Sequence, residues 1–127
     1  MDYSIKIGGE AGQGIQTIGD VLARVFARSG YHVFTDQEYQ SRIRGGHNFY
    51  RIRLSDVPVR APKRQPDILI ALDRASIALH MPEMRDEGII VYDPDMLKQQ
   101  FDGPSFLDIP FLTLATETGA GRLAAHT

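Results

Sequence analysis

The chain has 127 residues, the length of one ordinary domain, and its 43% hydrophobic and 24% charged residues are typical of a globular protein. The formal net charge of −2 argues against binding of polyanions through bulk charge. Because the sequence contains no cysteine, it excludes disulfides, zinc fingers, thiolate-bound iron–sulfur clusters and a thiol nucleophile in this chain. No apolar run approaches the roughly 20 residues of a membrane helix, and residues 1–6 hold no signal-peptide core. The sequence therefore predicts a single cytoplasmic domain, 1–127, that binds no membrane.

The first predicted elements form a strand–loop–helix–strand unit. Residues 3–8 are short, partly β-branched and followed by a glycine-rich turn over 8–14, which is typical of a strand and its exit loop. One apolar stripe at helical spacing then predicts a helix ended by Gly30, and residues 31–35 read as a second strand. The members of the stripe are Ile15, Ile18, Leu22, Val25 and Phe26. We expect a right-handed crossover and a parallel sheet for this unit.

The middle of the chain predicts a turn, a strand and an extended connection. Residues 37–44 are polar and indicate a short helical turn and loop. Residues 48–54 alternate apolar and polar side chains, as in a half-exposed strand with basic residues on its wet face. Prolines 58, 62 and 66 exclude a helix over 57–66.

The last part of the chain alternates buried strands with short helices. The continuous apolar runs 67–72 and 88–92 predict strands buried on both faces. Asp73 is placed to cap a short helix through residue 79, a last strand is expected over 109–115, and a helix is expected to begin over 119–127. This order favours a Rossmann-like three-layer α/β/α domain with a mostly parallel sheet.

The charge is unevenly distributed. Residues 42–66 hold seven basic side chains, opposed only by Asp56, while the rest of the chain is acidic. The basic members are Arg42, Arg44, Arg51, Arg53, Arg60, Lys63 and Arg64. Such a block indicates an anion site or an acidic partner, and a solvated basic strand is the alternative, particularly for Arg51 and Arg53.

The glycine loop before the first helix is a candidate anion site. Free backbone N–H groups at a helix N-terminus bind phosphate without needing a side-chain cation. Gly12, Gln13 and Gly14 match the first part of the dinucleotide fingerprint, Thr17 replaces its third glycine, and Asp36 stands where a ribose-binding acid would. The alternative is a tight turn that needs glycine only to pack helix on sheet. No Walker lysine follows, which argues against nucleotide hydrolysis.

A second candidate cluster precedes the half-exposed strand. Arg42 and Arg44 offer planar bidentate donors to phosphate or carboxylate, and Gly45 and Gly46 allow close backbone approach. His47 is a donor, a base or a structural residue. The remaining histidines lack the spacing of metal ligands.

At these two clusters the chain resembles the gamma domain of 2-oxoacid:ferredoxin oxidoreductases, most of all the gamma segment at the N-terminus of 2-oxoglutarate-type alpha subunits. The resemblance is carried by residues 7–15 (IGGEAGQGI) and 38–48 (EYQSRIRGGHN). It continues through 67–73 (DILIALD) and 88–93 (GIIVYD), and so covers most of the chain in the same order.

The resemblance implies a part in the oxidative decarboxylation of a 2-oxoacid, such as pyruvate or 2-oxoglutarate, to an acyl-CoA, with electrons passed to ferredoxin or flavodoxin. It implies thiamine diphosphate with Mg²⁺ and iron–sulfur clusters in partner subunits, and a gamma domain that assists assembly and coenzyme A binding. By position, the coenzyme A site would comprise Gly12, Gln13, Gly14, Arg42, Arg44, Gly45, Gly46 and His47.

The sequence departs from the complete enzyme in two ways. It has no Gly-Asp-Gly motif for thiamine diphosphate and no cysteine for clusters, so we expect the chain to be inactive alone. Family gamma segments also run further, which predicts a C-terminally truncated or separately encoded component. The alternatives are a free-standing nucleotide-binding module using Gly12, Gly14 and Asp36, and a binder of nucleic acid or acidic protein through 42–64, which the scarcity of aromatic residues there disfavours.

Overall fold

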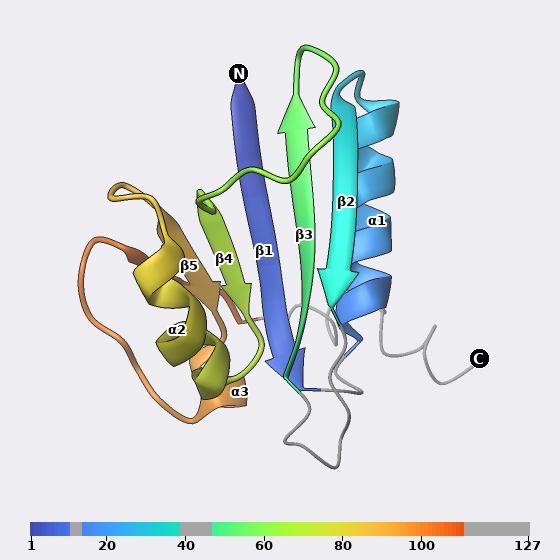
Figure 1. The fold of residues 1–127 in the computed structure, drawn as a ribbon. Coiled ribbons are helices and arrows are strands. Elements are labelled where there is room, and N and C mark those ends of the chain that lie inside the picture. Colours follow the sequence, from blue (N-terminus) through green and yellow to red (C-terminus); the bar gives the residue numbers. More distant parts are fainter. Residues whose placement is uncertain (11–13, 39–46, 111–127) are drawn as a thin grey trace, which may run out of the picture.

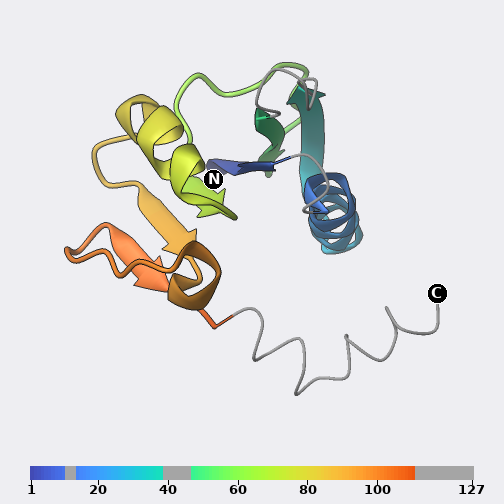
Figure 2. The same ribbon diagram turned by 90° about the horizontal axis from the view of Figure 1, so that it is seen from below.

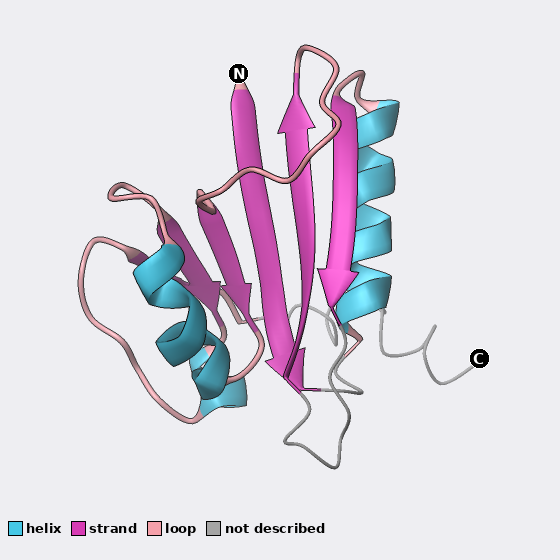
Figure 3. Cartoon of the chain, in the orientation of Figure 1, coloured by secondary structure: helices cyan, strands magenta, loops and turns pink. Residues whose placement is uncertain are grey.

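A computed structural model describes residues 1–10, 14–38 and 47–110 of the chain. The first half of these residues forms β1 (Asp2–Glu10), α1 (Ile15–Arg28), β2 (His32–Glu38) and β3 (His47–Ser55). The second half forms β4 (Ile68–Ala71), α2 (Arg74–His80), the 3₁₀ helix η2 (Met81–Glu83), β5 (Ile89–Tyr92), α3 (Pro94–Leu97) and β6 (Phe106–Asp108). Figure 3 shows that strands and short helices alternate along the chain after β3.

The strands form one mixed six-stranded sheet in the order β2-β3-β1-β4-β5-β6. β1, β4, β5 and β6 are paired in parallel, whereas β3 is antiparallel to both of its neighbours, β1 and β2. The expected mostly parallel sheet is therefore confirmed. Within the first strand–helix–strand unit, β1 and β2 are not direct neighbours, because β3 lies between them.

Helices cover both faces of the sheet, as the predicted three-layer arrangement requires. Figure 2 shows α1 on one side of the strands and α2 on the other. The face under α1, here called the α1 face, carries Ile5, Ile7 and Ile52. The opposite face, here called the α2 face, carries Leu69 and Tyr92. Each face thus has its own hydrophobic cluster, and the sheet is the shared middle layer (Figure 1).

Most predicted elements are confirmed, with three differences. The strand expected over 109–115 begins earlier: β6 occupies Phe106–Asp108, and residues 111–115 lie outside the described residues, as do 39–44 and 119–127. β2 runs on to Glu38, into the segment expected to be a turn. The third difference concerns β4 and β5, which are fully buried on the α2 face only; on the α1 face Ile68 and Ile70 are half-buried and Ile89 is 41% exposed.

Candidate functional site

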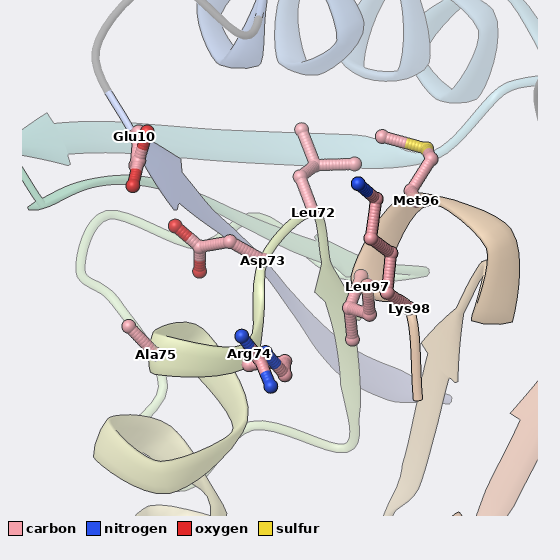
Figure 4. A pocket seen from close by; sticks show the side chains of 8 residues that line it. All are labelled: Glu10, Leu72, Asp73, Arg74, Ala75, Met96, Leu97 and Lys98. Carbon is pink, nitrogen blue, oxygen red and sulfur yellow. The ribbon is translucent and has the colours of Figure 1, made fainter. Parts of the chain in front are cut away.

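A cavity of about 420 Å³ lies at the carboxyl ends of β1, β4 and β5. Ligands of open α/β sheets bind at this edge, because the loops that follow parallel strands converge there. The cavity is lined by Glu10, Leu72, Asp73, Arg74, Ala75, Met96, Leu97 and Lys98. In Figure 4, Glu10 and Asp73 lie on one side of it, and Met96 and Lys98 on the other. The lining therefore combines an apolar floor with charges of both signs.

Asp73 contributes an unsatisfied acceptor to this region. It is the N-cap of α2, where its Oδ1 accepts a hydrogen bond of 2.8 Å from the Ser76 backbone N–H. Its Oδ2 is buried and has no hydrogen-bond partner among residues 1–10, 14–38 and 47–110. A buried carboxylate oxygen left without a donor is costly, and such atoms often face a ligand or an ordered water. Asp73 is therefore suited to accept an N–H or O–H group from a molecule in the cavity.

Two cations border the same cavity. Arg74 and Lys98 are exposed, and within the described parts of the chain neither has an ion-pair partner. Lys98 ends α3 in the left-handed region with φ of 54°, the one non-glycine residue with positive φ among those described. Side chains other than glycine rarely adopt this conformation, and such residues gather at functional sites. The conformation places a lysine where glycine would fit the backbone better.

The N-terminus of α1 follows the glycine loop without a side-chain cap. Gly14 is the N-cap residue with φ of 78° and provides no side-chain cap, and no acidic residue lies in the first turn, which the structure describes in full. Such an end favours anions, because the free N–H groups and the helix dipole both attract negative charge. Of the predicted loop residues, Gly14 fits this role, while Gly12 and Gln13 lie outside the described residues.

Register pairing relates the two predicted loops to each other. Glu10, the last residue before segment 11–13, is the direct partner of His47, the first residue after segment 39–46. Both segments are therefore attached at the same end of the sheet, on neighbouring strands. Arg42, Arg44, Gly45 and Gly46 lie outside the described residues, so His47 alone represents the second cluster in the structure.

His47 belongs to a buried polar network on the α2 face. Its Nε2 lies 2.7 Å from Nε2 of His80, and Nδ1 of His80 lies 3.1 Å from Oε2 of Glu83. Lys6, which is 5% exposed, donates a 2.8 Å hydrogen bond to the same Glu83 oxygen, and its ammonium group lies 4.3 Å from the centre of the Phe49 ring. The network ties β1 and β3 to the end of α2.

The network fixes the protonation pattern of its histidines. Burial lowers the pKa of His80, with Lys6 acting in the same direction against the opposing effect of Glu83. Burial alone would raise the pKa of Glu83, but hydrogen bonds from Lys6 and His80 outweigh it and lower that pKa. A neutral His80 that donates through Nδ1 to Glu83 must accept at Nε2, so His47 donates there. Nδ1 of His47 is also buried and has no hydrogen-bond partner among the described residues.

The model of the family described as pyruvate ferredoxin/flavodoxin oxidoreductase matches residues 4–126. The chain belongs to this family. The resemblance noted in the sequence is thereby confirmed.

Curated family members include much longer proteins. The alpha subunit of 2-oxoacid:ferredoxin oxidoreductase 2 from Aeropyrum pernix is 35% identical over 102 residues, which are 80% of this chain and 16% of that protein. The 2-oxoglutarate synthase subunit KorC from Methanothermobacter marburgensis is 32% identical over 99 residues, which are 76% of this chain and 53% of that subunit. This chain therefore spans about a sixth of the first protein and about half of the second.

Solved structures in the oxidoreductase family share the fold. The 2-oxoglutarate:ferredoxin oxidoreductase from Magnetococcus marinus, determined with 2-oxoglutarate, coenzyme A and succinyl-CoA bound, matches with a TM-score of 0.76 and 26% identity over 91% of this chain and 21% of that chain. A keto/oxoacid ferredoxin oxidoreductase gamma subunit from Geobacter sulfurreducens gives a TM-score of 0.73 at 22% identity, covering 91% of this chain and 64% of the subunit. The predicted α/β fold is confirmed by these likenesses.

The sequence missed several residues of this edge. Asp73 was expected only as a helix cap, and neither Lys98 nor the link from His80 to Glu83 was expected. The signal for Asp73 was present, because a polar residue directly after a buried strand lies at the carboxyl edge of a parallel sheet. Lys98 carried no signal, since its conformation depends on how α3 ends.

Thr17 and Asp36 do not take the roles that the dinucleotide fingerprint assigns to their positions. Thr17 is exposed, and Gly19 instead makes the close contact of α1 with the sheet, because an added Cβ there would lie 2.4 Å from the Tyr50 ring. Asp36 is ion-paired with Arg51, and its strand β2 is separated from β1 by β3. The position of Asp36 therefore argues against a ribose-binding role beside the glycine loop.

Proposed function

We propose that this chain is the gamma-type component of a 2-oxoacid:ferredoxin oxidoreductase, in which it supports assembly and helps to bind coenzyme A. The complex would convert a 2-oxoacid to an acyl-CoA and reduce ferredoxin or flavodoxin. Family membership over residues 4–126 is the observation that carries the proposal. The named relatives and the coenzyme A-bound structure of the Magnetococcus marinus enzyme support it.

The redox chemistry of such an enzyme needs groups that do not fit this chain. The sequence has no cysteine to ligate an iron–sulfur cluster, and it lacks a Gly-Asp-Gly motif for thiamine diphosphate and Mg²⁺. The described residues contain no group of three His, Cys, Asp or Glu side chains able to hold a metal ion. We therefore assign thiamine diphosphate, Mg²⁺ and the clusters to partner subunits.

Coenzyme A matches the chemistry of the carboxyl edge. Its phosphates suit the uncapped N-terminus of α1 and the cations Arg74 and Lys98. Its hydroxyl and amide groups suit Oδ2 of Asp73 and Nδ1 of His47, two buried atoms that have no partner within the described part of the chain. The residues predicted from sequence, Gly12, Gln13, Gly14, Arg42, Arg44, Gly45, Gly46 and His47, belong to the same proposal. His47 begins β3 and Asp73 follows β4, the two strands that flank β1, so two strand spacings of about 10 Å in total separate these strands.

The two alternative functions are less compatible with the fold. A dinucleotide module needs Asp36 at the ribose, but Asp36 is paired with Arg51. A binder of nucleic acid needs free cations on β3, but Arg53 is paired with Asp2, and the carboxylate partners of Arg51 and Arg53 hold their pKa values above the usual range. Among the described residues, no helix combines the length and the apolar surface that a membrane span requires.

Ligand titration tests the coenzyme A site. We expect calorimetry on the chain to show binding of coenzyme A, weaker binding of 3′-dephospho-coenzyme A and no binding of NAD or FAD. Lys98→Ala and Lys98→Gly both remove the ammonium group and should weaken coenzyme A binding about tenfold, the effect of losing one charge-assisted hydrogen bond. Because Lys98→Gly also relieves the left-handed backbone, equal weakening in both variants assigns the effect to the charge. Arg24→Ala, an exposed change on α1, is the control.

The assembly part of the proposal has a separate test. The chain alone should show no 2-oxoacid-dependent reduction of ferredoxin, and activity should appear when subunits carrying thiamine diphosphate and clusters are added. Full activity of those subunits without this chain would contradict the proposed role. Tight NAD binding without a response to coenzyme A would instead support the nucleotide-binding alternative.

A further inference from the structure

The two edges of the described sheet differ in length. β6, at one edge, has three residues, whereas β2, at the other edge, has seven. The register of β2 with β3 is continuous from His32 to Glu38, so β2 contains no bulge, and it contains neither proline nor lysine. Short length, bulges, proline and lysine commonly protect edge strands against pairing with another chain. β2 has none of these features and is therefore the edge that is suited to accept a further strand.

The hydrogen-bond pattern identifies the backbone groups that β2 directs outward. Successive residues of a strand direct their N–H and C=O groups to opposite edges. The N–H of Asp56 donates a 3.3 Å hydrogen bond to the C=O of Met1, so the even-numbered residues of β3 bond to β1 and the odd-numbered ones to β2. The even-numbered residues of β2 stand opposite those odd-numbered residues. Val33 and Thr35 therefore direct their N–H and C=O groups to the outer edge, beyond which the described sheet has no strand.

The side chains of β2 complement a second copy of the same strand in an antiparallel pairing centred on Phe34. In this register Phe34 stands opposite Phe34 of the second copy, Val33 opposite Thr35, and His32 opposite Asp36. Aromatic pairs, β-branched pairs and pairs of opposite charge stabilise antiparallel strands. The outward groups of Val33 and Thr35 then exchange four hydrogen bonds across the seam, two for each such pair.

Other symmetric registers fit the sequence of β2 less well. A pairing centred on Thr35 places each Phe34 opposite a carboxylate, and a pairing centred on Asp36 places two carboxylates directly opposite each other, which is destabilising. In the register centred on Phe34, Asp36 keeps its ion pair with Arg51, and its carboxylate has further lone pairs to accept a hydrogen bond from His32. The charges of the strand thus favour one register.

The described helices leave room for a second copy at this edge. The twofold axis of an antiparallel strand pair is perpendicular to the sheet, so both copies of α1 lie on the same face, one on each side of the seam. Figure 2 shows α1 beside β2 on that face. On the opposite face, where Phe34 lies half-buried, α2 packs on β1 and β4 and does not extend over β2.

We propose that β2 is a homodimerisation edge, at which two copies of this chain pair antiparallel through residues 32–36 and join their sheets into one. Phe34 contributes the aromatic pair at the twofold axis, and Val33 and Thr35 contribute the backbone hydrogen bonds. The contact uses neither the cavity at the carboxyl edge nor a partner subunit, so it is independent of the proposed binding of coenzyme A.

Sedimentation velocity over a range of protein concentrations tests the contact. We expect a monomer–dimer equilibrium for the chain. Thr35→Pro removes one outward N–H from each copy, whereas the hydrogen bonds to β3 come from even-numbered residues and remain. This change should weaken the dimer about thirtyfold, the effect of losing two backbone hydrogen bonds. Thr35→Val keeps the N–H and should dimerise as the unchanged chain does.

Disulfide trapping covers the case in which Thr35→Pro fails to fold, and it has no background because the chain has no native cysteine. In the proposed register the two Cα atoms of residue 34 lie about 4.5 Å apart, within reach of a disulfide. The two copies of His32, an exposed residue on the same face of β2, lie four residues apart along the seam, about 14 Å. Mild oxidation should therefore cross-link Phe34→Cys into a dimer and leave His32→Cys monomeric.

Three results would overturn the proposal. A chain that stays monomeric at about 100 μM has no dimer contact of useful affinity. A dimer that Thr35→Pro leaves unchanged, or equal cross-linking of Phe34→Cys and His32→Cys, would place the contact elsewhere. Slow hydrogen exchange of the Val33 and Thr35 amides at concentrations where the chain is monomeric would show that the edge is already covered within one copy.

Discussion

At the residue scale, the α2 face is notable for the charge it buries. Lys6 and His80 are 5% and 2% exposed, yet each has a charged or polar partner, Glu83 for both and His47 in addition for His80. A buried cation is tolerated only when it is paired. The arrangement makes this part of the fold sensitive to pH.

We expect the stability of the chain to fall as the pH drops below 6.5. Burial lowers the pKa of His80 from its ordinary value of 6.5, so the unfolded chain binds more protons than the folded chain in the range just below that value. The free energy of unfolding then decreases with falling pH, by at most about 1.4 kcal/mol per pH unit for one group. Urea unfolding between pH 7.5 and 5.5 measures this slope. Glu83 takes up a proton only at lower pH, because its pKa is lowered, and so does not contribute in this range.

His80→Gln should flatten that slope, whatever its effect on stability at pH 7.5. His32→Gln changes an exposed histidine and should leave the slope unchanged. An unaltered slope in His80→Gln would show that the pair formed by His47 and His80 does not cause the pH dependence.

The sequence predicted few of these side-chain contacts. His47 was predicted from its loop motif, but its partner His80 lies 33 residues away and had no recognisable spacing. Side chains of β1, β3 and α2 meet here only because β3 pairs with β1. Contacts that depend on strand order are therefore not readable from local pattern.

At the element scale, the contact between α1 and the sheet depends on one small residue. Gly19 is buried beneath the Tyr50 ring, and the hydroxyl of Tyr50 donates a 2.7 Å hydrogen bond to Asp20. The Tyr50 ring thus lies over the backbone of α1, and the hydrogen bond of its hydroxyl group to Asp20 holds it there. A larger residue at position 19 must displace either the ring or the helix.

Gly19→Ala should destabilise the chain although alanine is the better helix former. The new Cβ would lie 2.4 Å from ring carbons of Tyr50, a distance that no real contact tolerates. Overpacking of this kind costs about 1–3 kcal/mol, more than the roughly 1 kcal/mol gained in helix propensity. Urea denaturation followed by circular dichroism measures the difference, with the exposed Thr17→Ala as control. An increase in stability for Gly19→Ala would contradict the packing described for α1.

Elements were predicted well where one local signal decided them. The apolar stripe beginning at Ile15, the cap Asp73 and the apolar runs of β4 and β5 each agree with the structure. β6 was misplaced, because Phe106 begins a strand of only three residues whose pairing with β5 is not local. The order of the strands was not predictable either, because the insertion of β3 between β1 and β2 changes no local sequence pattern in those two strands.

At the scale of the whole molecule, Asp67 joins three separate segments. Its Oδ2 accepts hydrogen bonds of 2.8 Å from the Ser4 backbone and 3.0 Å from Lys63, and its Oδ1 lies 2.6 Å from Nε of Arg85. These partners belong to β1, to the proline-containing connection after β3 and to the turn before β5. The residue is 4% exposed, so water does not replace these contacts.

Asp67→Asn should loosen all three segments together. The amide keeps one acceptor oxygen and loses the charge, at a cost of about 2 kcal/mol, because Lys63 and Arg85 are themselves partly solvated. Urea unfolding is the measurement, and Asp56→Asn is the matched control, since Asp56 is 63% exposed and pairs with the ammonium group of Met1. Equal effects of the two changes would show that Asp67 does not join the segments energetically.

The position of β1 has a consequence for how the chain is made. Of the described strands, β1 is synthesised first, yet it ends in the centre of the sheet, hydrogen-bonded on one edge by residues 47–55 and on the other by residues 68–71. One edge stays open until Ser55 has been synthesised and the other until Ala71 has been synthesised, and an open apolar strand is prone to wrong pairing. Wrong pairing during synthesis would therefore affect the centre of the sheet rather than its rim.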